Sequence, residues 1–499
     1  RLATGKDIPC FALTSPDAGS DAASMTDTGV VCYREFEGKK DVLGILLNWN
    51  KRYITLGPVA TVLGLAFKLK DPDHLIGEKD DWGITCALIP TDTAGVEIGA
   101  RHYPLNGAFQ NGPNSGKDVF IPIDWIIGGQ KQAGQGWRML MECLAAGRSI
   151  SLPALSTGAG KLTSRATGAY SRIRRQFKTP IGRFEGIEEP LARIAATTYT
   201  MDATRVLTAG ALDLGQSPSV ISAIAKYNLT EAMRKCVDDA MDIQGGSGIC
   251  LGPNNLMARV YQSVPVSITV EGANILTRSL IIFGQGAIRC HPHVFNEMQA
   301  ANEPDQEKAS IDFDQAFWGH IGFAISNAVR TVVLGLTYSR FSRAPVDDLS
   351  SRYFQHLSHF SSAFALTADI AMAVLGGELK RKEKLSGRLA DVLSQMYLMS
   401  ATLKRFHDQG QQSDDVALLQ WSCDNSLRIM QQSMDKFLTN FPNRPVAWFL
   451  RRAIFPYGKH FRGPSDKLGH KVANLLLNPS AARDRLTSGI YIPDTSDAD

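Results

Sequence analysis

The sequence has little net charge, no paired cysteines and no internal repeat. Its 53 Lys and Arg nearly balance 49 Asp and Glu, and the formal charge of +4 is too small to indicate nucleic acid as a partner. The 8 cysteines occur singly, without a CxxC pair, which favours reduced thiols in a cytosolic protein over a disulfide framework. We identify neither a signal peptide nor an apolar run of about 18 residues that would span a bilayer.

Several motifs of common enzyme classes are also missing. Residues 112–118 (GPNSGKD) are one residue short of a phosphate-binding P-loop, and Asp118 replaces the hydroxyl residue that would hold magnesium. No G-x-S-x-G segment supports a hydrolase. Cys290, His291 and His293 could supply metal ligands, but no second cluster has zinc-like spacing, so we predict no metal site.

The pattern of apolar residues divides the chain into three predicted domains. Residues 1–128 contain short β-branched runs separated by Gly, Pro, Asn and Asp, which predicts a β-sheet domain. Residues 129–298 have helical spacing, and residues 305–499 follow a polar stretch, Asn302–Lys308, that we interpret as a linker. We therefore expect an α+β fold in which a β-domain precedes a helical bundle and an extra all-α extension.

Three apolar stripes recur at steps of three and four residues in the third region. They are Ile325, Ala328, Val329, Val332, Val333 and Leu336; Leu385, Leu389, Val392, Leu393 and Met396; and Val416, Leu419, Cys423, Leu427, Met430, Met434 and Phe437. An apolar helical face usually packs on a core, so we expect all three stripes to lie inside a helical bundle.

Four segments resemble, in order and spacing, the motifs of one enzyme family. They read FALTSPDAGSD at Phe11–Asp21, WNKRYITLG at Trp49–Gly57, RRQF at Arg174–Phe177 and VEGAN at Val270–Asn274. Together they resemble the acyl-CoA dehydrogenases, and the third region resembles the extension of the long bacterial type often called FadE. The resemblance implies a middle β-domain of barrel or sheet form, a C-terminal helical domain and FAD as cofactor. The family's N-terminal helical domain is missing, and because the chain begins with Arg1 we expect a truncated protein.

The first two segments would contact the flavin. By the resemblance, Thr14 contacts the flavin and Ser20 lies where flavin and acyl-CoA approach one another. Tyr53 stands where the family has Trp and still offers an aromatic face, while Thr55 would hydrogen-bond near the reactive nitrogen. Without the other motifs, these segments would be an ordinary polar turn and an ordinary strand.

The third segment would bind the pyrophosphate of the flavin. Arg174 and Phe177 are three residues apart, which predicts that they share one face of a helix. A guanidinium pairs its planar fork with phosphate oxygens, and in the family this contact reaches a neighbouring subunit. In long-chain relatives the extension takes the place of a second dimer, so we expect a homodimer.

Glu271 is the predicted catalytic base, and Gly272 beside it permits a tight turn at the substrate. Residues Val264–Val270 are apolar apart from one Ser and one Thr, so burial should raise the pKa of the Glu271 carboxyl, as proton abstraction requires. The alternative role is that of an acid at a helix N-terminus. Some family members take the base from an earlier helix, but residues 148–177 contain no Asp or Glu.

The reaction that the resemblance implies is α,β-desaturation of medium- or long-chain acyl-CoA to trans-2-enoyl-CoA in fatty-acid β-oxidation. An electron-transfer flavoprotein would accept the electrons. Two alternatives stay open: an acyl-CoA oxidase on the same fold, which would use oxygen, and a non-catalytic helical scaffold. Asp242 stands where the family has a flavin-contacting Gln, and Lys178, Ala273 and Ser15 also depart from the family's motifs.

Basic and aromatic residues are interleaved in the stretch Asn443–Lys471. Seven Lys or Arg lie among Trp448, Phe449, Phe455 and Tyr457. Such a stretch could touch a membrane surface, although a solvated helix face and packing onto the catalytic domain are the other interpretations. We expect a cytoplasmic protein, with peripheral contact to the inner membrane as the alternative that this stretch raises.

Overall fold

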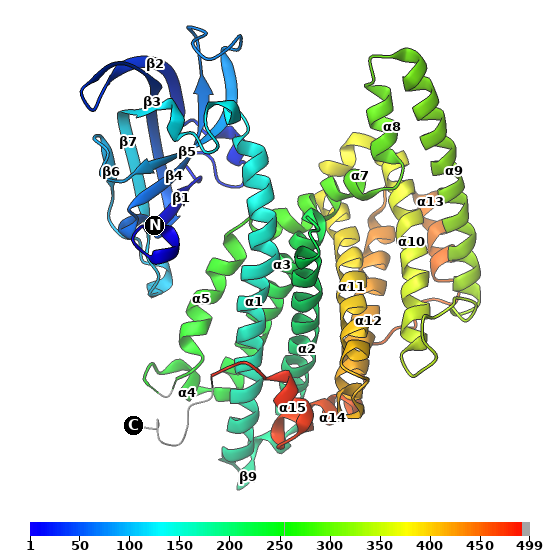
Figure 1. Ribbon diagram of the computed structural model, residues 1–499. Coiled ribbons are helices and arrows are strands. Elements are labelled where there is room, and N and C mark those ends of the chain that lie inside the picture. The colour runs from blue at the N-terminus through cyan, green and yellow to red at the C-terminus, as the bar shows by residue number, and fades with distance from the viewer. Residues whose placement is uncertain (254, 492–499) are drawn as a thin grey trace. The chain divides into compact units, whose positions relative to one another are not determined.

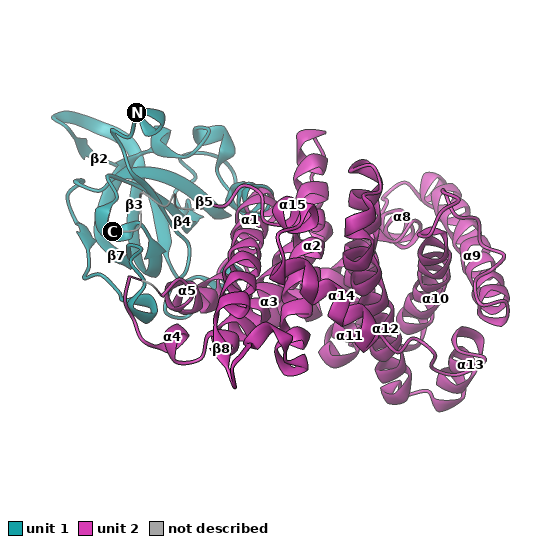
Figure 2. Ribbon diagram, turned by 90° about the horizontal axis from the view of Figure 1, so that it is seen from below, with its two compact units in different colours: residues 1–144 teal, residues 145–499 magenta. Residues whose placement is uncertain are grey.

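Strands fill the first part of the chain and helices the rest, in a computed structural model that describes residues 1–253 and 255–491. The chain divides into unit 1, residues 1–144, and unit 2, residues 145–499 (Figure 2). The predicted α+β order is confirmed, with a mixed sheet followed by a mostly helical region. The boundaries at 128/129 and 298/305 stay predictions, and residues 492–499 of the predicted extension lie outside the described residues.

Unit 1 is built on one seven-stranded sheet, which the blue and cyan strands of Figure 1 form. Its strands are β1 (Pro9–Ala12), β2 (Thr28–Phe36), β3 (Lys39–Thr55), β4 (Val62–Lys70), β5 (Asp81–Pro90), β6 (Val96–Ile98) and β7 (Asn111–Pro122). They lie in the order β1-β4-β2-β3-β7-β6, and β5 pairs with β4 outside this path. The β1–β4 and β2–β4 pairs are parallel and the others antiparallel.

The sheet forms because β-branched and other apolar residues alternate along its strands and bury one face. In β3, for example, Ile45 and Leu47 are fully buried and join Val31 of β2 and Leu63 and Leu65 of β4 in one core. The apolar runs that predicted strands fall on β4, β5 and the end of β7. The sheet is therefore the scaffold that holds the first two family motifs.

Helices dominate the rest of the chain. They are α1 (Gly136–Ile173), α2 (Glu185–Asp213), α3 (Ser219–Gln244), α4 (Gly246–Ile249), α5 (Ala258–Thr269), α6 (Asn274–Leu276), α7 (Gly286–Cys290), α8 (Val294–Ala301), α9 (Gln306–Leu336), α10 (Ser351–Leu375), α11 (Glu383–Asp408), α12 (Val416–Asn440), α13 (Arg444–Ile454), α14 (Asp466–Leu477) and α15 (Ala481–Leu486). A π-helical segment, Thr277–Gln285, joins α6 to α7, and a two-stranded ribbon of β8 (Arg175–Gln176) and β9 (Thr179–Pro180) follows α1.

Two of the three predicted apolar stripes lie in the core of unit 2. Leu389 and Val392 of α11 and Leu419 and Met430 of α12 are fully buried, in one cluster with residues of α3 and α10. A second cluster joins α2 and α3 to Val472 of α14. The extension and the helical domain therefore share hydrophobic cores, which explains why they form one unit.

The third stripe, on α9, is placed wrongly by the prediction. Ile325, Val329 and Leu336 are each more than half exposed, whereas Asn327 and Thr331 of the same helix are buried. The helix packs on α8, α10 and α13 through small and polar side chains and the buried Leu334. Most of the predicted stripe therefore faces away from the protein, although Ala328 is partly buried against the core. Periodicity predicted the helix correctly but not the face that packs.

The polar stretch 302–308, interpreted as a linker, is a short connection with the start of a helix. Helix α8 ends at Ala301, and the Asp305 carboxylate caps α9 by accepting from the N–H groups of Glu307 and Lys308. Its polarity therefore reflects helix capping.

Two helices of the described chain are long and apolar enough to cross a membrane, by length and composition only. They are Gln306–Leu336 and Ser351–Lys380, and the bent pair Ala258–Thr269 and Asn274–Cys290 would be a third if it formed one span. The expectation that the sequence holds no such segment is wrong, because scattered polar residues such as Asn327 interrupt the apolar run without making it polar on average.

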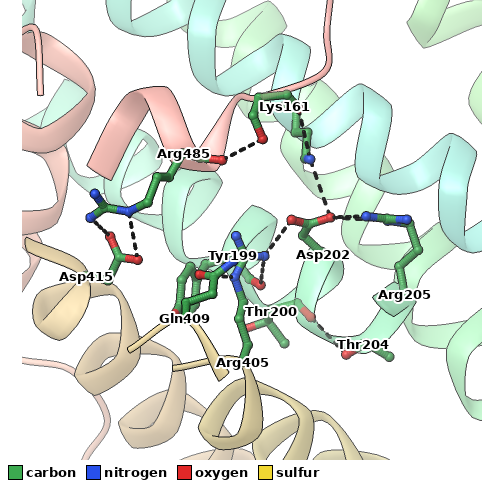
Figure 3. Close-up of polar contacts among 11 residues, drawn as sticks. Lys161, Tyr199, Thr200, Asp202, Thr204, Arg205, Arg405, Gln409, Asp415 and Arg485 are labelled. Atoms are coloured by element: carbon green, nitrogen blue, oxygen red, sulfur yellow. Dashed lines mark hydrogen bonds and ion pairs between the residues drawn. The ribbon is translucent and has the colours of Figure 1, made fainter. Parts of the chain in front are cut away.

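A buried ion cluster fastens the extension to α2. The Asp202 carboxylate lies 2.6 Å from Nη1 of Arg405 in α11, and Arg205 and Lys161 lie 2.8 and 3.4 Å from its other oxygen (Figure 3). The Arg405 guanidinium also covers the Tyr199 ring at 4.5 Å. Because both Asp202 and Arg405 are more than nine-tenths buried, neither charge is stable there without the other.

We expect Asp202→Ala to lower the free energy of unfolding by about 3–5 kcal/mol, since it leaves the Arg405 charge buried and unpaired. The matched control is Asp408→Ala on α11, whose ion pair with Lys404 is half exposed and should contribute less than about 1 kcal/mol. Urea unfolding of both variants measures the difference. Equal losses would show that Asp202 and Arg405 do not act as a buried pair.

Candidate active site

The first two family motifs are neighbours in unit 1. The Phe11–Asp21 segment leaves β1 and runs beside β3, where the Arg52 N–H donates to the Thr14 carbonyl at 3.0 Å. The Arg52 side chain donates to the Pro16 carbonyl at 2.8 Å. The segment Phe11–Asp21 and the end of β3, about forty residues apart in the sequence, therefore lie side by side and form one edge of unit 1.

Three buried polar side chains hold this edge together. Lys51 Nζ lies 2.5 Å from Asp27 Oδ2, which also accepts from Ser15 Oγ at 2.5 Å, and it donates to the Leu13 carbonyl at 2.9 Å. Burial lowers the pKa of Lys51, and the Asp27 contact opposes that shift. Ser15, which departs from the family motif, thus has a structural use here. Sequence reasoning missed Asp27 because it lies outside the motifs.

Tyr53 lies on a β-bulge rather than in an ordinary strand. The register between β3 and β7 shifts between Lys51 and Ile54, and Tyr53 has a φ of +60°. Asn111 Nδ2 donates to the Tyr53 carbonyl at 2.9 Å and so secures the bulge. A bulge redirects a side chain, and the Tyr53 ring is 59% exposed, with the Arg52 guanidinium 5.0 Å from its centroid.

The predicted flavin-contacting hydroxyls have no protein partner among the described residues. Thr14 is half-buried, and Ser20 and Thr55 are exposed, and none of their hydroxyls makes a hydrogen bond within the described part of the chain. Each hydroxyl offers one donor and two acceptor positions. Together with the exposed Tyr53 ring, this edge offers the polar groups and the aromatic face that a flavin ring requires.

Arg174 and Phe177 do not share a helix face, so that prediction is wrong. Helix α1 ends at Ile173, and the chain turns between β8 and β9 through Phe177 and Lys178, which have φ values of +49° and +63°. Two successive left-handed residues make the tight turn of a two-residue hairpin. Phe177 stands at its tip with 91% of its surface exposed, and Arg174 is also exposed.

Glu271 lies in the tight loop between α5 and α6. It has a φ of +53° and Gly272 a φ of +90°, a pair of left-handed conformations that few side chains other than glycine adopt readily. Oε2 of Glu271 is buried and has no hydrogen-bond partner among the described residues. Opposite it on α1 is Gly147, where a Cβ atom would lie 3.5 Å from each carboxylate oxygen. The position on the earlier helix that faces the acid thus carries no side chain.

Two cations hold the backbone of this loop. Arg148 Nε donates to the Glu271 carbonyl at 2.7 Å. The fully buried Lys226 of α3 donates to the carbonyls of Ile268 and Gly272 at 3.1 and 2.8 Å and to Asn274 Oδ1 at 2.7 Å. An ammonium has three protons, and all three are used on groups around the loop.

Burial raises the pKa of Glu271, as predicted, and the charges of Arg148 and Lys226 oppose part of the rise. Burial lowers the pKa of Lys226 to about 8, while Glu271 acts in the other direction. The charge of each group therefore favours the charged form of the other. Sequence reasoning missed Arg148 and Lys226. A signal for Lys226 was available, because a lysine directly after the apolar residues Ala223–Ala225 indicates a buried ammonium that needs acceptors.

Arg174 belongs to a different region from Glu271. Gly147 and Ile173 are 26 residues apart on α1, which at 1.5 Å per residue is about 39 Å. The structure thus brings Thr14 and Tyr53 together in unit 1 and Glu271, Arg148 and Lys226 together in unit 2, and it leaves Arg174 and Phe177 at the far end of α1.

His291, one of the three residues considered as metal ligands, lies beside Asp369 and His320. Both are distant from it in the sequence, so the local spacing of residues could not predict them. The Nε2 atom of His291 lies 2.9 Å from Asp369 Oδ1, and His320 lies beside both, with its Nδ1 2.8 Å from Glu297 Oε1. The spacing of His291, His320 and Asp369 could hold a metal ion. However, the N–H groups of His293 and Val294 donate to His291 Nδ1, which leaves the proton on Nε2 and favours a hydrogen bond to Asp369.

Comparison with known proteins gives the same family across nearly the whole chain. The family described as "Acyl-CoA dehydrogenase, middle domain" matches residues 10–112, "Acyl-CoA dehydrogenase, C-terminal domain" matches 134–283, and "Acyl-CoA dehydrogenase, C-terminal, bacterial type" matches 288–499. These descriptions correspond to the sheet, the helical domain and the extension.

Individual relatives cover different shares of the chain. The probable acyl-CoA dehydrogenase FadE10 of Mycobacterium tuberculosis is 27% identical over 425 residues, which are 82% of this chain and 60% of that protein. A protein named HemX from Proteus mirabilis is 66% identical over 104 residues, 21% of this chain and 61% of that protein. The chain thus spans about 60% of the length of each of these two relatives.

A solved structure confirms the fold. The acyl-CoA dehydrogenase from Bacillus anthracis, described as complexed with FAD, superposes with a TM-score of 0.75 at 19% identity and covers 95% of this chain and 76% of its own. Because the three family descriptions account for the sheet, the helical domain and the extension in order, the chain belongs to the acyl-CoA dehydrogenase family.

Proposed function

We propose that the chain is the flavin-binding and catalytic part of an FAD-dependent acyl-CoA dehydrogenase that desaturates acyl-CoA between its α and β carbons. The observation that carries the proposal is the buried Oε2 of Glu271, which has a raised pKa and no partner among the described residues. A buried acid without a protein partner is costly, and a substrate proton would give it one. We further propose medium- or long-chain substrates, as the bacterial-type extension suggests, and an electron-transfer flavoprotein as acceptor.

The exposed polar and aromatic groups of the first two motifs fit FAD. The free hydroxyls of Thr14, Ser20 and Thr55 would bind the ring edge, and Tyr53 would offer its exposed face. Arg174 would pair with the pyrophosphate of the flavin bound to a second subunit, because a guanidinium matches phosphate oxygens and this contact crosses between subunits in the family. When bound, FAD would supply the acceptor for the hydride that leaves the β carbon.

The base loop has the groups that the first proton transfer needs. Glu271 would take the α-proton, and a pKa raised toward neutral matches it to that weakly acidic position. The Glu271 N–H has no acceptor among the described residues and would donate to the thioester carbonyl oxygen, where charge develops. Arg148 and Lys226 would keep both groups in place by holding the loop's carbonyls.

We expect Glu271→Gln to slow anaerobic reduction of the flavin by palmitoyl-CoA by about 10²–10⁴-fold, the usual contribution of a general base. The full-length protein should keep its bound flavin, because the amide has nearly the shape of the acid. Stopped-flow absorbance of the flavin measures the rate. Glu189→Gln, an exposed acid of α2, is the control. Unchanged bleaching in Glu271→Gln would move the base elsewhere, and absence of flavin from the wild type would favour the scaffold alternative.

The same rate should depend on pH through Glu271. Only the carboxylate accepts a proton, so the rate rises with pH through a pKa that lies above the ordinary value for Glu. Arg148 lowers that pKa, so Arg148→Gln should move the rising limb to higher pH. Arg138→Gln, whose side chain is exposed on the same helix, should leave the limb in place. A limb that stays at the wild-type pH in Arg148→Gln would contradict the assignment of Glu271.

The electron acceptor needs its own test, because an acyl-CoA oxidase on the same fold would use oxygen. We expect turnover in air to yield little hydrogen peroxide and to require an electron-transfer flavoprotein. Peroxide equal to the enoyl-CoA formed would establish the oxidase alternative.

We also propose a homodimer in which the β8–β9 turn meets a second subunit. In the family the contact of Arg174 reaches a neighbouring subunit, and Phe177 stands 91% exposed at the tip of the same turn, where a second subunit would cover it. Phe177→Ser should therefore weaken the dimer and lower its flavin content, as sedimentation velocity and absorbance would show. Leu214→Ser, which changes an apolar residue that is 81% exposed after α2, is the control. An unchanged dimer with full flavin would remove this turn from the interface.

A further inference from the structure

Helix α9 carries a continuous apolar face that points away from the protein. Trp318, Ile325, Val329, Val332 and Leu336 follow one another at steps of seven, four, three and four residues, which places them on one side of the helix. All five side chains are exposed, and Trp318 is 67% exposed. Soluble proteins seldom leave so long a row of large apolar side chains in water.

This face is not needed to pack the helix. The buried side of α9 consists of Ala316, Asn327, Thr331, Leu334 and Gly335. Of the most apolar 18-residue window of α9 only 22% is buried, against 44% for the window of α10 beside it. Of these five buried residues only Leu334 is large and apolar, whereas an ordinary surface helix buries most of its large apolar side chains.

Helix α13 extends the apolar face. Its outward residues Pro445, Trp448, Phe449 and Arg452 follow the i, i+3, i+4, i+7 spacing of one helical side. Trp448 is 64% exposed, with the Arg452 guanidinium 5.8 Å from its ring. Figures 1 and 2 show α9 and α13 next to each other at the end of unit 2 farthest from α1, and the two helices are in contact.

Unpaired arginines surround the C-terminal half of this face. Five of them have no carboxylate partner in the described part of the chain: Arg330, Arg340, Arg343, Arg444 and Arg452. By contrast, the neighbouring Arg451 and Lys459 are both paired with Asp435. The surface thus combines aliphatic and aromatic side chains with free positive charge.

We propose that this surface, which we name the α9–α13 face, docks on an anionic lipid bilayer. Its members are Trp318, Ile325, Val329, Val332, Val333 and Leu336 of α9, Phe341 after it, and Trp448 and Phe449 of α13, with the five arginines around them. Apolar side chains would enter the acyl boundary, tryptophan would lie at the headgroup level, and the guanidiniums would reach lipid phosphates. The helix would lie in the membrane plane, because its other side stays packed on α8, α10 and α13.

A second copy of the chain is a poorer occupant of this face. In a two-fold symmetric dimer the same patch meets itself, which would bring the unpaired arginines of two subunits together. Among the acidic residues of α9, Asp312 and Asp314 lie about 36 and 33 Å from Leu336 along the helix, given 1.5 Å per residue. The loop after α9 adds the exposed Asp347, and Asp348, which faces His407, so the five arginines still outnumber the acids beside them. Anionic lipid neutralises the arginines and covers the apolar residues at the same time.

The structure also shows which part of the stretch Asn443–Lys471, which the sequence indicated for membrane contact, is exposed. Its second half enters α14, which packs on α2 and places Val472 in a core of unit 2. Within the stretch, α13 presents Trp448 and Phe449 outward, and Tyr457 after it is exposed and stacks on Tyr338. Helix α9, which is distant in the sequence, supplies most of the apolar surface.

The test is co-sedimentation of the full chain with vesicles, comparing phosphatidylglycerol–phosphatidylethanolamine with phosphatidylcholine alone. The wild type should bind the anionic vesicles, and binding should fall as salt screens the arginines. Trp448→Ser with Phe449→Ser should reduce the partition coefficient roughly tenfold or more, because two interfacial aromatic anchors are lost. The fold should survive, since both side chains are exposed. Leu214→Ser with Ile249→Ser, two exposed apolar residues elsewhere in unit 2, should bind like the wild type.

A second variant separates charge from apolar contact. Arg444→Gln with Arg452→Gln should lower binding to anionic vesicles and narrow the difference between the two lipid mixtures, because two of the five arginines are neutralised. Sedimentation velocity of all variants runs in parallel. Failure of the wild type to bind anionic vesicles would overturn the proposal, as would a dimer that Trp448→Ser with Phe449→Ser dissociates. Neither outcome touches the flavin-reduction tests, so this proposal and the proposed function fail independently.

Discussion

The fully buried ammonium of Lys226 is the contact on which the base loop depends. It has no access to water, so its three protons require acceptors, and the loop supplies them through Ile268, Gly272 and Asn274. Meeting all three at once requires the chain to turn sharply at Glu271 and Gly272, where both φ values are positive. The strained turn is therefore explained by the lysine beneath it, and the unpartnered carboxylate oxygen is a consequence of the turn.

The extension takes part in this arrangement. The π-helical segment Thr277–Gln285 follows the base loop, and its Arg278 forms a bidentate ion pair with Asp391 of α11, with contacts of 2.7 and 2.5 Å. Ser279 donates to Glu383 of the same helix at 3.1 Å. π-Helical segments often occur at functional sites, and here a nine-residue one is fixed from outside the catalytic domain. The buried pair of Asp202 and Arg405 fastens α11 to α2 in the same way. The extension thus supports the helices that carry the base.

Local patterns predicted the parts of this structure that local physics determines. The strands of unit 1, the helices of unit 2 and the raised pKa of Glu271 follow from alternation, periodicity and an apolar surrounding. Contacts between distant segments did not follow. Nothing near Glu271 in the sequence points to Arg148, which is 123 residues away, or to the glycine that faces the acid. The hairpin at Phe177 was missed because a three-residue spacing fits a helix as well as a tight turn, and only the left-handed φ values distinguish them.

The misplaced stripe of α9 shows why periodicity indicates a helix but not its surroundings. The stripes of α9, α11 and α12 have the same spacing, yet two face the core and one faces outward. The difference lies on the opposite sides of the helices: α9 offers Gly335, which lets the backbone of Ala453 approach, and Asn327, whose amide bonds back to the Phe323 carbonyl at 3.0 Å. Small residues, and polar residues whose hydrogen bonds are made within the helix, allow α9 to pack closely while burying little apolar surface. Most of the large apolar side chains of α9 therefore stay outside the protein core. A row of apolar residues on a helix therefore indicates that some partner covers it. Whether that partner is the protein's own core depends on which residues stand on the opposite side of the helix.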